Sequence, residues 1–232
     1  AFDKAAEAYQ ESLARDPNPP DGQEIRVELA RCLFLQRKFD ESLAALGTSD
    51  SADAWLLRGE CSYANGKVEE AGRCASEALK RDAQDADVLA FKATLAAVAG
   101  NQREAADLLA KAVRQKPNEY QLRYRLVQAY RRVGENNLAD EQEKGLEDLR
   151  KKQDELHDLI AQASQDIGDV QLRYRIATIA QFLGMSEMSN QWLKAARMIE
   201  IANAGLVNQP TILGGIGPLG QGEPKTSTQP SP

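Results

Sequence analysis

The chain has 232 residues and a formal net charge of −6, and 42% of its residues are hydrophobic while only 6% are aromatic. This acidic balance argues against a general nucleic-acid binder, because neutralising phosphate groups requires a basic surface. We therefore expect a helical protein rich in Ala and Leu, with no nucleic-acid partner.

Cysteine, histidine and the apolar runs give no sign of catalytic or membrane chemistry. Cys32, Cys61 and Cys74 follow no metal-binding or disulfide spacing, and His157 stands among acidic residues. We predict no catalytic residue, no metal, no cofactor and no enzymatic activity. No stretch reaches the ~20 apolar residues of a membrane span. A soluble and preferentially cytoplasmic protein is expected, although a segment before Ala1 could have carried a signal peptide.

Residues 1–17 carry apolar side chains at helical spacing and are predicted to be the second helix of a truncated hairpin. A complete hairpin is expected over about residues 21–50. Its second helix is cut short by the turn-forming sequence Gly-Thr-Ser-Asp-Ser at 47–51.

A period of 34 residues governs the middle of the chain. Two columns of small residues keep this spacing, namely Gly66, Gly100 and Gly134, and Ala71, Ala105 and Ala139. Each glycine suits a tight turn between two helices, and each alanine suits the point where those helices cross at about 8–10 Å. The period predicts hairpins over about residues 52–85 and 86–119.

The stretch AWLLRGECSYANGKVEEAGRCASEALKRDA, residues 54–83, resembles the tetratricopeptide repeat. Trp55, Gly59, Gly66, Ala71 and Ala78 fall where that family places its signature residues, and Arg58 replaces the usual Leu. The resemblance implies an all-α, right-handed superhelical solenoid of helix-turn-helix repeats. It also implies that the first helices line a concave groove that binds a peptide or a protein segment.

The pentapeptide QLRYR occurs at residues 121–125 and again at 171–175, which is 50 residues later instead of 34. Both copies open the first helix of a hairpin, so the 16 extra residues must lengthen the helix between them. We expect a fourth hairpin over 120–167 with a second helix of roughly 30 residues, about 45 Å long. A fifth hairpin, over 170–204, should turn back along 153–167 as a projecting arm.

Partner-binding residues are predicted on two surfaces. The groove residues are Tyr63, Tyr124, Gln128, Arg131, Tyr174 and Gln181, with Leu56, Glu60, Ala90 and Thr94 expected to face the groove beside them. The arm residues are Trp192, Ile199 and Leu206. Tyrosine offers apolar area with a polar tip, although packing against a neighbouring helix is an equal alternative for these tyrosines. The arginines between Tyr120 and Gly134 make an acidic peptide a candidate ligand.

The composition changes to Gly and Pro at Gly205, and residues 205–232 are predicted to be a disordered, flexible tail. The predicted function is a non-catalytic protein-protein interaction scaffold that uses the groove, the arm or both. Two alternatives stay open. One is a structural assembly subunit that forms a homo-oligomer through its long C-terminal helices, and the other is a docking or regulatory segment of a larger enzyme whose N-terminal part is missing.

Overall fold

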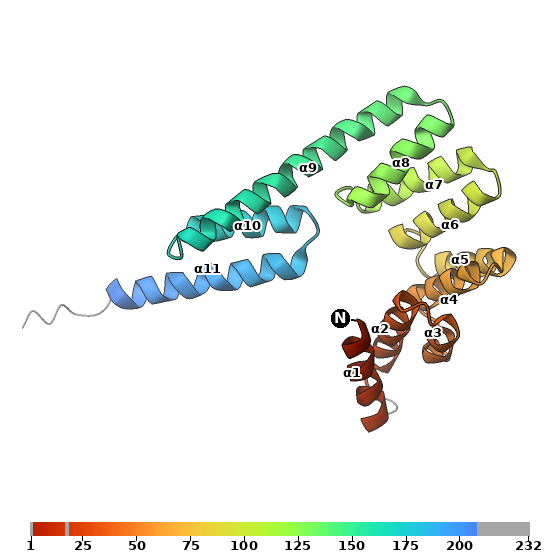
Figure 1. Ribbon diagram of the computed structural model, residues 1–232, viewed down its shortest axis with the longest axis horizontal. Helices are drawn as coiled ribbons and strands as arrows, with labels where there is room; N and C mark the ends of the chain where they lie inside the picture. The colour runs from red at the N-terminus through yellow and green to blue at the C-terminus, as the bar shows by residue number, and fades with distance from the viewer. Residues whose placement is uncertain (1, 17–18, 208–232) are drawn as a thin grey trace, which may run out of the picture.

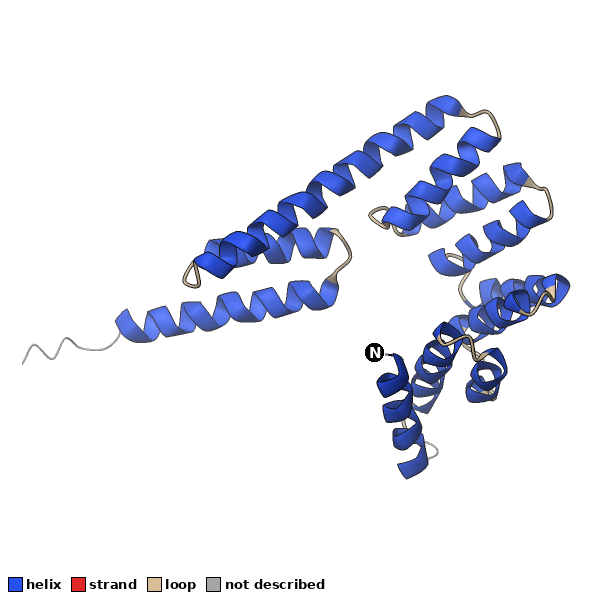
Figure 2. Cartoon of the chain, viewed as in Figure 1, coloured by secondary structure: helices blue, strands red, loops and turns tan. Residues whose placement is uncertain are grey.

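The computed structural model describes residues 2–16 and 19–207, and every regular element in this part is an α-helix (Figure 2). The helices are α1 (Phe2–Arg15), α2 (Gly22–Leu35), α3 (Phe39–Leu46), α4 (Ala52–Ala64), α5 (Val68–Arg81), α6 (Ala86–Val98), α7 (Gln102–Gln115), α8 (Tyr120–Arg132), α9 (Asn136–Gln165), α10 (Val170–Phe182) and α11 (Ser186–Val207). Consecutive helices pack as hairpins that follow one another along a curved path (Figure 1). The expected all-α solenoid is confirmed.

The turns between paired helices explain the glycine column. Gly66, Gly100, Gly134 and Gly184 have φ between 76° and 85°, a left-handed conformation that costs glycine nothing. The α2–α3 turn has the same geometry without a glycine, because Arg37 adopts a φ of 63°. In each hairpin the residue after this position donates its N–H to a carbonyl five residues earlier, as Lys38 does to Leu33 at 3.0 Å. The first hairpin therefore has the same turn as the others.

Small residues allow the helices of the central hairpins to approach closely. Ala71, Ala105 and Ala139 are fully or almost fully buried, as the 34-residue column predicts. Gly59 of α4 also lies against a neighbouring helix, because a Cβ at this position would be 2.8 Å from the Phe91 ring of α6. The crossing of α4 with its neighbours therefore requires glycine at this position.

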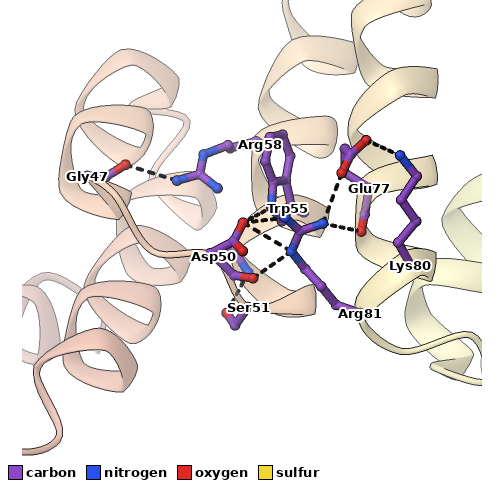
Figure 3. Close-up of polar contacts among 9 residues, drawn as sticks. Gly47, Asp50, Ser51, Trp55, Arg58, Glu77, Lys80 and Arg81 are labelled. Carbon is purple, nitrogen blue, oxygen red and sulfur yellow. Dashed lines mark hydrogen bonds and ion pairs between the residues drawn. The ribbon is translucent and has the colours of Figure 1, made fainter.

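The short helix α3 has eight residues where α5 and α7 have fourteen, and a polar cluster holds the loop that follows it. Figure 3 shows Asp50 of this loop between Trp55 and Arg81. Asp50 accepts a hydrogen bond from the Trp55 indole at 2.7 Å and ion-pairs with Arg81. The Arg58 and Arg81 guanidinium carbons lie 4.9 and 5.0 Å from the Trp55 ring centroid. Arg58 also donates to the Gly47 carbonyl oxygen at 2.9 Å, so the shortened repeat is joined to the next by side chains.

The long helix α9 spans 30 residues, the length that the spacing of the two QLRYR copies predicts. Its second half packs against α10, which returns beside it. The shared cluster contains Leu156, Ile160, Ala163, Ile176, Ile179 and Leu183, so the fifth hairpin does turn back along residues 153–167. This part of the arm is confirmed.

Two details of the arm differ from expectation. The arm does not project freely at its turn, because the Asn118 side chain of the α7–α8 loop donates to the Phe182 carbonyl oxygen at 2.8 Å. Helix α11 also continues to Val207, so residues 205–207 are helical and not part of a tail. The rest of the expected tail, 208–232, lies outside the described residues.

Candidate functional site

The first helices of the hairpins, α2, α4, α6 and α8, are the ones predicted to line the groove. Helix α4 packs against both α2 and α6, so that these helices stand side by side. Counting back from each turn residue places four side chains at the same helical position, a set that we call the central row: Arg31, Glu60, Thr94 and Gln128. All four are half-buried. The central row therefore runs across four successive helices along the predicted groove.

The Arg125 side chain of α8 extends over α6 and forms hydrogen bonds there. Its Nη2 donates to the Ala90 carbonyl oxygen at 2.8 Å and to the Thr94 hydroxyl at 2.7 Å. Both acceptors are neutral, and no described carboxylate forms an ion pair with this guanidinium. Burial lowers the pKa of Arg125, because the charged form loses hydration without gaining a counterion.

A cleft of about 450 Å³ opens beside the Arg125 guanidinium. It is lined by Ala93, Thr94, Ala97, Gln102, Ala105, Leu109, Tyr124, Arg125, Gln128, Ala129 and Arg132. Tyr124 and Gln128 are two of the predicted groove residues, and Tyr124 is 47% exposed. The cleft thus combines an apolar floor of alanines with two arginines and hydrogen-bonding side chains at its edge.

Glu60 of α4 is the second charged group of the central row. It makes no hydrogen bond and no ion pair with any described residue. Desolvation raises its pKa from 4.5 to about 7, an effect that Arg31 opposes and Asp87 increases. Those neighbours are engaged elsewhere, since Arg31 lies 3.5 Å from an Asp53 oxygen and Asp87 lies 2.7 Å from the Lys116 ammonium.

The remaining predicted groove residues have varied environments. Tyr63 is half-buried and packs edge-to-face on Phe91 with ring centroids 6.2 Å apart. Arg131 forms a 2.7 Å ion pair with Glu143 of α9. Tyr174 donates to Glu200 of α11 at 2.9 Å. Gln181 is exposed and lies at the contact between the α7–α8 loop and the α10–α11 turn, away from the Arg125 cleft.

Two residues expected beside them are not on the groove surface. Leu56 and Ala90 are only 3% and 4% exposed, because they pack between helices. This expectation was wrong for a physical reason. On an inner helix with neighbours on both sides, the strip left open to solvent is too narrow to include these side chains.

Three exposed apolar residues at the ends of first helices escaped the sequence reasoning. Leu35, Val98 and Phe182 are 50%, 56% and 45% exposed, although large aliphatic and aromatic residues are usually buried. Each stands two residues before the turn residue of its hairpin. That shared position is the signal that could have identified these residues from the sequence.

The three predicted arm residues all lie on α11. Trp192 is half-buried and packs against the α9–α10 cluster, and Ile199 is also half-buried. Leu206 lies in the last turn of α11, and its side chain is outside the described part. Among the described side chains of α11, the large apolar residues Met198 and Ile201 are 71% and 73% exposed. The role of the predicted trio in binding stays a prediction.

The repeats identify the family of the chain. The tetratricopeptide repeat profile matches residues 2–49, 43–86 and 63–120, which together cover just over half of the sequence. The chain belongs to the tetratricopeptide repeat family. This agrees with the resemblance seen at residues 54–83. No curated protein gives a significant match over the chain.

Solved structures with the tetratricopeptide (TPR) fold are similar to the chain. A thermophilic TPR protein of Thermus thermophilus has a TM-score of 0.50 and 17% identity, over 78% of this chain and 91% of that one. The APC/C hetero-tetramer Cut9-Hcn1 has a TM-score of 0.50 and 14% identity, over 86% of this chain and 37% of that one. YrrB, a TPR protein with an unusual peptide-binding site, has a TM-score of 0.49 and 18% identity, over 86% and 95%. At these identities the likeness concerns the fold alone.

The TPR fold is generally a non-catalytic module that binds proteins or peptides, so the chain is a protein-interaction scaffold. Across residues 2–16 and 19–207, no three His, Cys, Asp or Glu side chains are arranged to hold a metal ion. No helix in the same ranges is long and apolar enough to cross a membrane. The three cysteines are buried and unpaired, and burial raises the pKa of each thiol.

Proposed function

We propose that this TPR protein is a scaffold that holds an extended peptide along the groove formed by α2, α4, α6 and α8, with a carboxylate of that peptide bound by Arg125. The observation that supports this most directly is a half-buried guanidinium at a cleft, bonded only to the neutral acceptors Ala90 and Thr94. Tyr124 and Gln128 stand at the same cleft and offer hydrogen bonds to a peptide.

The energetics of the unpaired guanidinium favour an acidic ligand. A charge taken partly out of water and left without a counterion costs free energy, and a carboxylate that approaches it recovers part of that cost. Arg125 can offer a planar pair of N–H donors to a carboxylate, which lysine cannot. Arg132 on the rim of the same cleft adds positive charge. These features support an acidic side chain or a terminal carboxylate as the anchor.

The two QLRYR copies provide a matched pair of variants to test this proposal. Random 12-residue peptides displayed on phage would be selected on the wild-type chain at 0.1 M NaCl, and enriched peptides would be measured by fluorescence polarisation. We expect R125K to weaken binding at least tenfold. R175K should leave binding unchanged, because Arg175 is exposed and pairs with Glu155 at 2.6 Å. If no peptide is enriched, or if both variants behave alike, the proposal is wrong.

Assembly through the arm is a second candidate function. Met198 and Ile201 are three residues apart on one face of α11, and both are largely exposed. A second copy of the chain that covers this face would bury two large apolar side chains. Sedimentation equilibrium of the intact chain should then show a dimer that I201D dissociates. A chain that stays monomeric at high concentration would exclude this function.

A further inference from the structure

Glu60 is a carboxyl group of the central row that forms no ion pair within the described residues. Its carboxylate is half-buried and makes no hydrogen bond or ion pair within the described residues, whereas nearby carboxylates are paired. Asp53 pairs with Arg31, and Asp87 pairs with Lys116. Arg31 is also 3.7 Å from Glu28, so its charge is shared between two other partners. An unpaired carboxylate in a partly dehydrated site is costly to maintain.

The position of Glu60 relative to Arg125 is fixed by the repeat. Thr94 is the equivalent of Glu60 on the next first helix, and Thr94 is the residue that the Arg125 guanidinium contacts at 2.7 Å. The Glu60 carboxyl of α4 therefore stands beside the helix over which the Arg125 guanidinium of α8 reaches, and neither group forms an ion pair within the described residues. Neighbouring helix axes lie about 8–10 Å apart, which an extended chain crosses in about three residues.

We propose that Glu60 is the cation-binding position of the groove and selects a Lys or Arg side chain of the bound peptide, about three residues away from the acidic residue that Arg125 holds. This inference rests on the proposed function, because it names a second contact of the same peptide. The predicted ligand is a short extended segment that carries both charges in a fixed order.

A cation fits Glu60 better than a neutral group does. Burial raises the pKa of this carboxyl to about 7, and the charged groups that act on it are Arg31 from α2 and Asp87 from α6. A Lys or Arg side chain that arrives at Glu60 favours its ionised form, so binding releases a proton wherever the free carboxyl is protonated. Affinity for such a peptide should therefore rise between pH 5.5 and pH 8.

The experiment repeats the phage selection on three proteins: the wild-type chain, E60Q and E60K. The wild type should enrich 12-residue peptides with an acidic and a basic residue about three positions apart. E60Q should keep the acidic preference and lose the basic one, and E60K should reverse the second preference to acidic. A matched control is E69Q, which removes the same charge from the exposed surface of α5 in the same hairpin.

Affinity measurements on synthetic fluorescein-labelled peptides complete the test. The wild-type chain should bind the enriched peptide at least tenfold more tightly than its Lys-to-Gln analogue at pH 8, and E60Q should bind the two about equally. Circular dichroism of each variant verifies that it is folded. Acidic peptides enriched with no basic residue, and unchanged by E60Q, would overturn the role of Glu60 and leave the proposed function standing. Enrichment of no peptide at all would overturn both.

Discussion

The two QLRYR segments have the same five residues at the start of α8 and of α10, yet their side chains make different contacts. In the first copy Arg125 reaches back to Ala90 and Thr94 of α6, in the groove. In the second copy Arg175 pairs with Glu155 of α9, on an exposed surface. The tyrosines differ as well, since Tyr124 borders the cleft whereas Tyr174 donates to Glu200.

The cause of the difference is the element that each copy packs against. Helix α8 follows the preceding repeat at the regular 34-residue spacing and therefore contacts α6 and α7. Helix α10 follows after 50 residues and packs on the extension of α9 instead. The repeated motif thus begins a helix in both places but makes different side-chain contacts. Its chemistry depends on what the spacing places beside it.

The apolar residues that directly follow the two copies should show the largest effect. Leu126 and Ile176 are 2% and 0% exposed, and truncating either to Ala should cost about 2–5 kcal/mol. I176A should loosen only the arm, because its cluster is formed by α9, α10 and α11. L126A should destabilise the central stack. Fluorescence of Trp192 in a W55F background, followed through urea unfolding, would report on the arm separately from the whole chain.

If both variants shift the Trp192 and far-UV transitions equally, the arm and the stack unfold as one unit. The two copies would then share one cooperative core despite their different neighbours.

Glu60, in the groove near the first copy, should make the free energy of unfolding depend on pH. The pKa of Glu60 is raised from 4.5 to about 7, so the folded chain binds a proton there that the unfolded chain has released. The contribution of Glu60 to stability is therefore most favourable below about pH 4.5, falls between pH 4.5 and 7, and is constant above. E60Q should be more stable than the wild type by about 1–2 kcal/mol at pH 8, after allowance for partial exposure.

The measurement is urea unfolding at pH 5, 6, 7 and 8 for the wild type and E60Q. A stability difference that does not change with pH would show that the carboxyl ionises as it does in water.

Substitutions of the arginines at the third position of QLRYR should have the next largest effect on stability. Arg173 is buried and donates to the carbonyl oxygens of Asp166 and Asp169 at 3.2 and 2.7 Å, which fixes the α9–α10 turn. R173K should lower the stability of the arm by about 1–2 kcal/mol, because the shorter reach of lysine leaves a buried carbonyl unpaired. Arg123 is less buried and bonds to Gln142 and Pro117, so R123K should cost less. Equal losses in thermal unfolding would contradict this order.

The tyrosines should show the smallest difference. The Tyr174 hydroxyl donates to Glu200 at 2.9 Å on an exposed surface, whereas no partner for the Tyr124 hydroxyl exists within the described residues. Y174F should lower the melting temperature by less than about 2 °C, and Y124F should leave it unchanged. The reverse order in differential scanning calorimetry would mean that the Tyr124 hydroxyl has a structural role.

The sequence predicted most of the fold because glycine and alanine columns report directly on turns and crossings. Gly66, Gly100 and Gly134 located three turns, and the interval between the QLRYR copies gave the length of α9. The turn at Arg37 carries no such mark, since an arginine there adopts the conformation that glycine favours elsewhere. The tie between Asn118 and Phe182 joins residues 64 positions apart and had no periodic signal.

The candidate site was less predictable, because pairing between charges depends on three-dimensional neighbours. The sequence pointed to the arginines of α8 together but could not separate Arg131, which is neutralised by Glu143, from Arg125, which is not. Glu60 appeared only as an ordinary groove position. Arg31 pairs with Glu28 of its own helix and with Asp53 of α4, and Glu60 is left without an ion pair. The pairing with Asp53 depends on the packing of α2 on α4.

Helix α9 has a mechanical consequence beyond its role in packing. Its first part is held by α8 and its last part by α10, but residues 150–154 between them are all exposed. The segment is held only within α9 itself, by backbone hydrogen bonds and by ion pairs such as Lys151–Glu147 and Lys152–Glu155, so it should resist bending less than the packed ends do. A bend of about 10° at the middle of a ~45 Å helix moves its far end by about 4 Å. Such a bend would move α10 relative to the α7–α8 loop. The hydrogen bond from the Asn118 side chain to the Phe182 carbonyl oxygen opposes this movement.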